Sequence, residues 1–227
     1  MANNFKNAVI RNISTDSNLP TTVYTVPDTL KAIAIELDCS NKSSAGVTVT
    51  VQLEDESLNE TKDQTGTVIS ANAHVISNVA VDATGVLTTT SAAVHNLIIN
   101  DRVVFTNGTD PSFTDASLPP SGDATLSETR MYYVQSIPST STFTIAETKS
   151  GTLLTFDNNG AVIVFTKIHL ADIIKDAPVP VGGTLKVISG QKLVLQSDSS
   201  GVNDKIYAYS SGANACDVIA SVLQDVS

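Results

Sequence analysis

The sequence of 227 residues is poor in the side chains that most often carry out chemistry. It has no tryptophan, two cysteines and two methionines, and its three histidines, His74, His95 and His169, lie far apart in the chain. Because zinc ligands usually come in closely spaced groups, this spacing argues against a metal site. No serine lies in a Gly-x-Ser-x-Gly turn, which presents the nucleophile of many hydrolases. We therefore expect no enzymatic activity and no cofactor, and for His95 a structural hydrogen bond.

Positive charge is also scarce. The chain has 13 Lys and Arg against 23 Asp and Glu, a formal net charge of −10, and its basic residues occur singly. Contacts with phosphates need clustered Lys and Arg, so we expect no nucleic-acid partner. No stretch approaches the roughly 18 apolar residues of a membrane span, and the segment Met1–Lys6 lacks the apolar core of a signal peptide. We therefore expect no membrane partner and assembly of the protein in a cytoplasm.

The two cysteines, Cys39 and Cys216, lie in strand-like segments and have no metal-ligand spacing between them. Without a secretion signal, buried free thiols are favoured over a disulfide, which is the alternative. The acidic residues that follow the first strands are predicted to form a solvated run, with a weak cation site as the alternative. This run comprises Glu54, Asp55, Glu56 and Glu60.

The residues that are abundant, Val, Ala, Thr, Ser and Asn, follow the period-2 pattern of strands. In Lys31–Cys39 the residues Ile33, Ile35, Leu37 and Cys39 fall on one face, and in Val47–Glu54 the valines alternate with Thr and Gln. We predict that these two segments pair as a hairpin. Other strands are predicted at 5–13, 21–26, 205–209 and 215–223; the last is apolar on both faces, as in a central strand covered on both sides, and a terminal helix is its alternative.

The segment Lys175–Leu195 is rich in proline and glycine between apolar runs. It predicts an extended edge fixed by Pro178 and Pro180, a turn at Gly182–Gly183 and a strand over 184–188. A second turn at Ser189–Gly190 then predicts a hairpin with a strand over 192–196.

A polar, acidic connector over residues 56–66 predicts a domain boundary, because no apolar periodicity crosses it. The region that follows has strands at 102–105, 131–136 and 142–146 and a loop of about twenty residues, Thr106–Leu126, which is typical of an exposed contact arm. We predict an all-β chain: an antiparallel, jelly-roll-like β-sandwich formed by residues 1–66 and 167–227, interrupted by a small β-barrel formed by residues 67–166.

The outer segments resemble a family of small virion structural proteins of tailed bacteriophages, especially those of marine bacteria. The residues that carry this resemblance are Tyr24–Pro27, Lys31–Leu37, Val47–Leu53, Lys175–Val187, Gln191–Gln196 and Asp217–Leu223. The inserted region is similar to a small β-barrel module of phage proteins, often likened to the first catalytic cysteine half-domain of ubiquitin-activating enzymes. Its resemblance lies in Val94–Phe105, Met131–Ile137 and Ser141–Ala146. No ubiquitin chemistry is implied.

The resemblance implies a structural component of a virion that packs as a homo-oligomer against other capsid or tail proteins. Capsid decoration is favoured, and a neck, tail or fibre-attachment role is the close alternative. The candidate subunit-contact residues are Pro178, Val179 and Pro180 in the edge segment and Phe113, Leu118 and Pro119 in the long loop. A different class of function, a carbohydrate- or receptor-binding module for host glycans, would use the same loop with the tyrosines of the inserted region, Tyr132 and Tyr133.

Overall fold

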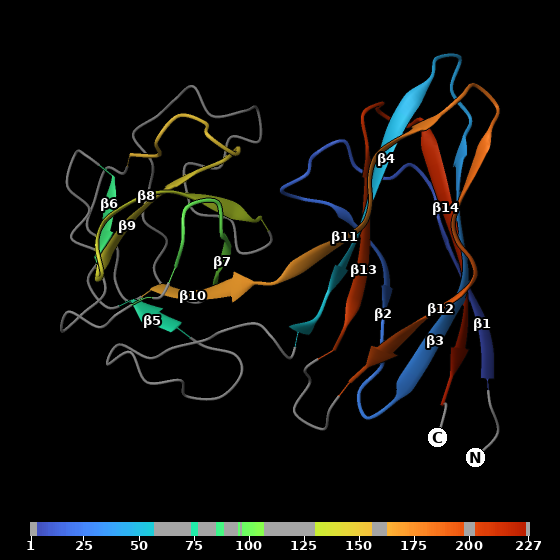
Figure 1. Cartoon of the computed structure of the whole chain (residues 1–227), viewed down its shortest axis with the longest axis horizontal. Helices are drawn as coiled ribbons and strands as arrows, with labels where there is room; N and C mark the ends of the chain where they lie inside the picture. The colour runs from blue at the N-terminus through green and yellow to red at the C-terminus, as the bar shows by residue number, and fades with distance from the viewer. Residues whose placement is uncertain are drawn as a thin grey trace. The chain divides into compact units, whose positions relative to one another are not determined.

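The computed structural model describes residues 4–56, 74–76, 85–88, 95, 97–106, 130–155, 163–197 and 203–225. These residues form strands joined by turns, so the predicted all-β class is confirmed. The chain divides into two compact units (Figure 1). One comprises Met1–Ser57 and His169–Ser227, and the other comprises Leu58–Ile168. The predicted boundary between residues 66 and 67, and the contact residues Phe113, Leu118 and Pro119, lie outside the described residues.

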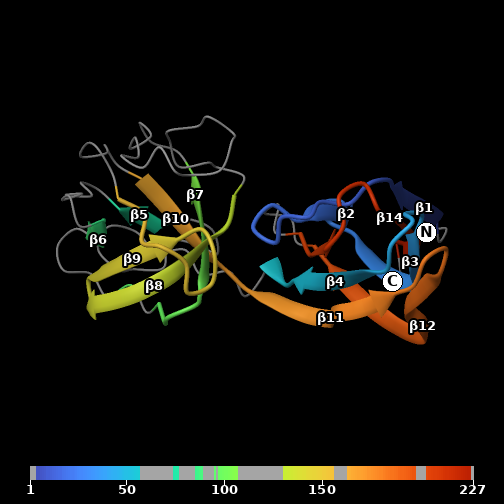
Figure 2. The ribbon, with the colours of Figure 1, turned by 90° about the horizontal axis from the view of Figure 1, so that it is seen from above.

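The first unit is a sandwich of two four-stranded antiparallel sheets, whose layers Figure 2 shows from above. The first sheet has the order β1 (Asn4–Ile10), β14 (Cys216–Gln224), β3 (Lys31–Asn41) and β12 (Thr184–Gln196). The second sheet has the order β11 (Leu170–Val179), β4 (Val47–Glu54), β13 (Lys205–Ser210) and β2 (Thr21–Thr25). The strands β4 and β11, which flank the second unit in the sequence, are therefore neighbours in one sheet.

The core of the sandwich lies between the inward faces of the two sheets. Leu37 and Leu195 from the first sheet and Val49 and Ile206 from the second have no exposed surface. Burial of each such side chain contributes roughly 1.5–3 kcal/mol relative to leaving it in water. Alternation along each strand is what delivers these residues to the same layer.

A β-bulge reverses the predicted face of the first half of β3. Along β14, Val222 pairs with Ala34 and Ser221 pairs with Glu36, so Ile35 is an additional residue in β3. Ala32 and Ala34 are consequently buried together with Leu37 and Cys39, whereas Ile33 and Ile35 are only partly buried. The prediction that Ile33 and Ile35 share a face with Leu37 was wrong because one additional residue shifts the alternation by one step.

The predicted hairpin of β3 and β4 was also wrong, because the two strands lie in opposite sheets. The chain crosses between the sheets through a turn organised by Asn41, which is 3% exposed. Its side-chain amide donates to the carbonyl oxygens of Ala45 at 2.8 Å and Val179 at 3.0 Å. Its side-chain oxygen accepts from the backbone nitrogen and the hydroxyl of Ser43 at 2.9 and 2.8 Å. This side chain ties the crossing to the end of β11.

The segment predicted as a hairpin over 184–196 is one continuous strand, β12, and both of its halves pair with β3. From Thr184 to Gln196 it advances twelve residues, while β3 advances nine, from Ser40 to Lys31. The three extra residues lie in two bulges, and Gly190 has a φ of 74°. A glycine of positive φ serves a bulge as well as a turn, which is why the sequence suggested a turn here.

The strand β14 has the predicted central place, between β1 and β3, and the alternative of a terminal helix is excluded. Its inward residues are buried, but Ile219 on the outward face is 45% exposed. The prediction that both faces are covered was therefore wrong within the described part of the chain.

The second unit contains a six-stranded antiparallel sheet. Its order is β5 (His74–Ile76), β10 (Ile163–Ile168), β7 (Arg102–Thr106), β8 (Tyr132–Ser139), β9 (Thr142–Ala146) and β6 (Val86–Thr88). Its core contains Phe105, Phe143 and Phe165, and the rings of Phe143 and Phe165 meet edge to face with centroids 5.2 Å apart. Closure of a barrel needs a ladder between the first and last strands. In the described residues β5 and β6 are not paired, so the predicted barrel is replaced by an open sheet.

Candidate interaction surfaces

The sandwich presents four edge strands, β1 and β12 in the first sheet and β2 and β11 in the second. An edge strand has unpaired backbone groups that can pair with another chain, and proteins commonly block this with bulges, proline or charge. The four edges differ in how far they are blocked.

The predicted contact segment Pro178–Val179–Pro180 lies at the end of β11. Pro178 and Pro180 are exposed, whereas Val179 is 1% exposed and packs in the sandwich core. Over the pairing of β11 with β4, β11 advances nine residues against seven, so it carries two bulged residues. At one bulge Asp176 has a φ of 47°, and its backbone nitrogen donates to the Thr50 hydroxyl at 3.0 Å. Bulges and prolines together block strand addition at β11.

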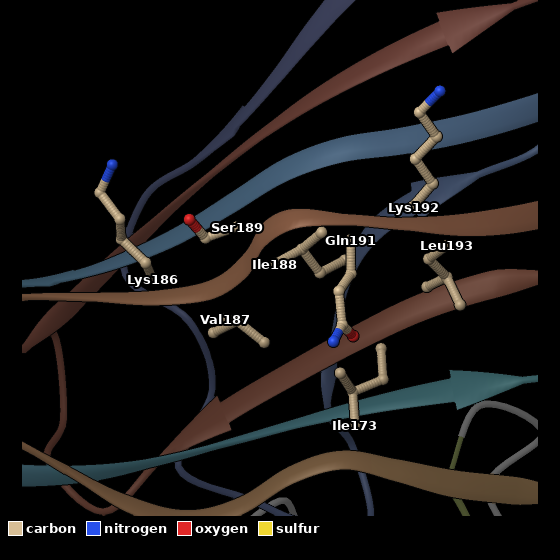
Figure 3. Close-up of a pocket in the computed structure, with 8 residues that line it drawn as sticks. All are labelled: Ile173, Lys186, Val187, Ile188, Ser189, Gln191, Lys192 and Leu193. Atoms are coloured by element: carbon tan, nitrogen blue, oxygen red, sulfur yellow. The ribbon is translucent and has the colours of Figure 1, made fainter.

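A hollow of about 370 Å³ lies where β11 and β12 face each other (Figure 3). The close-up shows Gln191 directed toward Ile173, while the amines of Lys186 and Lys192 point away from them. Lys186 instead approaches Glu36 at 3.5 Å. Four aliphatic side chains line this hollow, together with one hydroxyl, one amide and two amines. Its lining comprises Ile173, Lys186, Val187, Ile188, Ser189, Gln191, Lys192 and Leu193.

The strand β1 forms the opposite edge of the first sheet. It pairs with β14 through seven consecutive residue pairs without a register shift. On its outward face Phe5 is 71% and Val9 55% exposed, with the polar Asn7 between them, and Val9 lies opposite Ile219 of β14. The sequence analysis did not identify this edge as a contact surface, although Phe5 and Val9 alternate with Lys6 and Ala8 as expected of a strand with one apolar face.

The outward face of the second sheet carries a buried polar network that the sequence did not indicate. Glu54, predicted to be solvated, is 2% exposed. It accepts a hydrogen bond from the Tyr207 hydroxyl at 2.7 Å and lies 3.6 Å from the amine of Lys205. Burial, followed by the charge of Glu54, holds the pKa of Tyr207 well above its usual range. Lys205 also pairs with Glu56 at 3.1 Å, so two members of the predicted acidic run share one lysine, while Glu60 lies outside the described residues.

In the second unit His95, Tyr132 and Tyr133 have structural contacts. The His95 ring, 3% exposed, has its Nε2 3.2 Å from the carbonyl oxygens of Ser139 and Thr142, and its Nδ1 accepts from the backbone nitrogen of Leu97 at 3.0 Å. The predicted hydrogen-bond role of His95 is confirmed. Tyr132 is 2% exposed in the core of the second unit, and the Arg102 guanidinium lies 4.9 Å from the ring centre of Tyr133.

The cysteines are buried free thiols, as predicted. Burial raises the pKa of Cys39 to about 12, with a smaller contribution from Cys216. Within the described ranges, no group of three or more His, Cys, Asp and Glu side chains is arranged to hold a metal ion. Nor is any helix among the described residues long and apolar enough to cross a membrane.

Comparison of the chain with protein-family models, with curated proteins and with solved structures gives no match. A functional proposal therefore rests on the resemblance of the outer segments, on the fold and on the surfaces described above.

Proposed function

We propose that this chain is a non-enzymatic structural component of a tailed-phage virion, a capsid decoration or cement protein that packs as a homo-oligomer on the particle. It would act in the virion, after assembly in the host cytoplasm, with itself and other capsid or tail proteins as partners. The proposal combines the resemblance of the outer segments with the strand order of the sandwich.

The strand order is the observation that carries the proposal. Numbered within the sandwich alone, the first sheet has the order 1-8-3-6 and the second the order 5-4-7-2. Two interleaved Greek keys of this kind make a jelly roll, an architecture that recurs in viral capsid and lectin domains. Jelly-roll-like topology is thus the finer description that we propose for the sandwich.

The surfaces support a packing role. Only 16% of the residues are charged, which leaves a surface of hydroxyl, amide and apolar groups. Isolated exposed apolar residues are normal, but Phe5, Val9 and Ile219 lie together on one outward face. Val9 and Ile219 are direct cross-strand neighbours, and the polar pair of Asn7 and Ser221 separates them from Phe5, so this face combines exposed apolar groups with a polar centre.

A count of copies per particle tests the proposal. The protein would be quantified in purified particles by mass spectrometry against isotope-labelled peptides, with the major shell protein as the internal reference. Copies in the hundreds support decoration of the shell, whereas about six or twelve copies would place the chain at the neck, tail or fibre attachment. Absence from purified particles would overturn a virion role altogether.

Lectin domains share the jelly roll, so a glycan-binding module is the alternative of a different class. Tyr132 is buried in the second unit and the Tyr133 ring contacts the Arg102 guanidinium, which does not favour glycan binding by these two tyrosines. A glycan array with the whole chain would test it, because saturable binding of one glycan class would replace the packing role by receptor binding.

A further inference from the structure

The edge strand β1 differs from the other three edges of the sandwich. Pairing along β12, β11 and β2 is interrupted by register shifts, and β11 also carries Pro178. Pairing of β1 with β14 is uninterrupted, and β1 has a hydrogen-bonded neighbour on one side only among the described strands. It contains no proline, and Lys6 is its single charged residue. Of the four edges, β1 is the one left open to strand addition.

The central part of β1, Phe5–Val9, is complementary to itself when two copies run antiparallel about Asn7, and the end residues Asn4 and Ile10 then lie opposite each other. In this register Phe5 lies opposite Val9 of the second copy, and the same pair repeats on the other side of the axis. Asn7 lies opposite Asn7, where two side-chain amides can donate to and accept from each other. Lys6 falls opposite Ala8, so no like charges face each other directly.

We propose that β1 pairs with β1 of a second copy about a two-fold axis at Asn7, which joins two four-stranded sheets into one continuous sheet. Such a contact is isologous, because the same strand serves both copies. The inference deepens the proposed homo-oligomer by naming its interface, and in that respect it rests on the proposed function.

The size of the contact sets its strength. Seven strand residues span about 24 Å, and the flank of one sheet is about 10 Å deep, which gives about 240 Å² for each copy. This is well below the roughly 800 Å² per partner of a stable complex. The β1 contact is therefore reversible in dilute solution and becomes populated where copies are held close together, as on a particle surface.

A cysteine at the axis tests the pairing in the full-length chain. Opposite residues of an antiparallel pair have Cα atoms about 4.5–5.5 Å apart, within the range that a disulfide spans. Asn7→Cys should therefore form a covalent dimer under mild oxidation of a concentrated solution, and the native thiols do not compete because both are buried. Val194→Cys is the matched control, an exposed position, 54% accessible, on the other edge of the same sheet.

A second pair of variants separates edge pairing from chance proximity. In the Asn7→Cys background, Val9→Lys should reduce the yield of dimer by on the order of tenfold, since both copies lose an apolar cross-strand pair. Val181→Lys makes the same change at a valine of similar exposure, 58% against 55%, in the turn after β11, and should leave the yield unchanged.

Equal cross-linking of Asn7→Cys and Val194→Cys, or a yield that Val9→Lys does not reduce, would overturn the proposal. Circular dichroism of each variant checks that the strands are retained. Failure here leaves the virion role standing if particles contain the chain in hundreds of copies, whereas cross-linking of a chain absent from particles would support the dimer and reject the virion role.

Discussion

Replacement of Asn41 by alanine should destabilise the sandwich by about 2–4 kcal/mol. The Asn41 side chain is 3% exposed, and the hydrogen bond that its amide nitrogen donates to the Val179 carbonyl oxygen is buried. An unsatisfied buried carbonyl costs about 1–3 kcal/mol, and loss of the bonds to Ser43 adds about 0.5–1.5 kcal/mol. Since the Val179 contact joins residues 138 positions apart, its loss should loosen the crossing and the end of β11 together.

Urea denaturation followed by circular dichroism measures this loss, and hydrogen exchange read by mass spectrometry assigns the transition to the sandwich. Asn4→Ala, at an exposed strand position, is the control and should change the free energy of unfolding by less than about 0.5 kcal/mol. Asn41→Asp should cost at least as much as alanine, because it places an acceptor against two carbonyl oxygens. A loss below about 0.5 kcal/mol for Asn41→Ala, or a stable Asn41→Asp, would refute the role given to this amide.

Three further outcomes follow from the same structure. Burial raises the pKa of Cys39 to about 12 from 9.0, so its thiol should resist Ellman's reagent in the folded chain. The free energy of unfolding should also fall as pH rises from about 9 toward 12, because the thiol ionises at a lower pH in the unfolded chain than in the folded one. Lys205→Met should cost about 3 kcal/mol in urea denaturation, because it removes the amine that lies 3.6 Å from the buried Glu54 carboxylate, whereas an unchanged midpoint would mean that this ion pair does not stabilise the fold. Replacement of residues 58–168 by a short Gly/Ser linker should leave a folded sandwich with the far-UV spectrum of a β protein; an insoluble product would contradict the independence of the two units.

The sequence predicted the strands better than it predicted their partners. The alternation in Val47–Glu54 correctly identified β4 and its core valines. The same alternation is produced by a hairpin and by a crossing between two sheets, so the partner of β3 depended on the turn at Asn41, whose contact with Val179 no local pattern reveals. Long-range hydrogen bonds of this kind are the part of the fold that a single sequence leaves open.

Bulges explain two further errors. Ser189–Gly190 has the composition of a hairpin turn, yet it lies inside β12, because a glycine of positive φ fits both structures. Ile35 looked like a core residue because one bulged residue is invisible to a period-2 pattern. Among the candidate contact surfaces, the prolines identify β11, whose bulges oppose strand addition, whereas β1 contains no proline or glycine that would identify it. A subunit contact at Pro178–Pro180 stays a prediction.

The adjacency of β4 and β11 gives the sandwich a further property. Glu54 and Leu170 are paired across one ladder, so a segment of more than a hundred residues begins and ends at neighbouring backbone positions. A tight turn could join the same two strands without altering the register of either sheet. Because the two strand ends that bear the second unit are adjacent, replacing that unit by another compact module should leave the strand pairing of the sandwich unchanged.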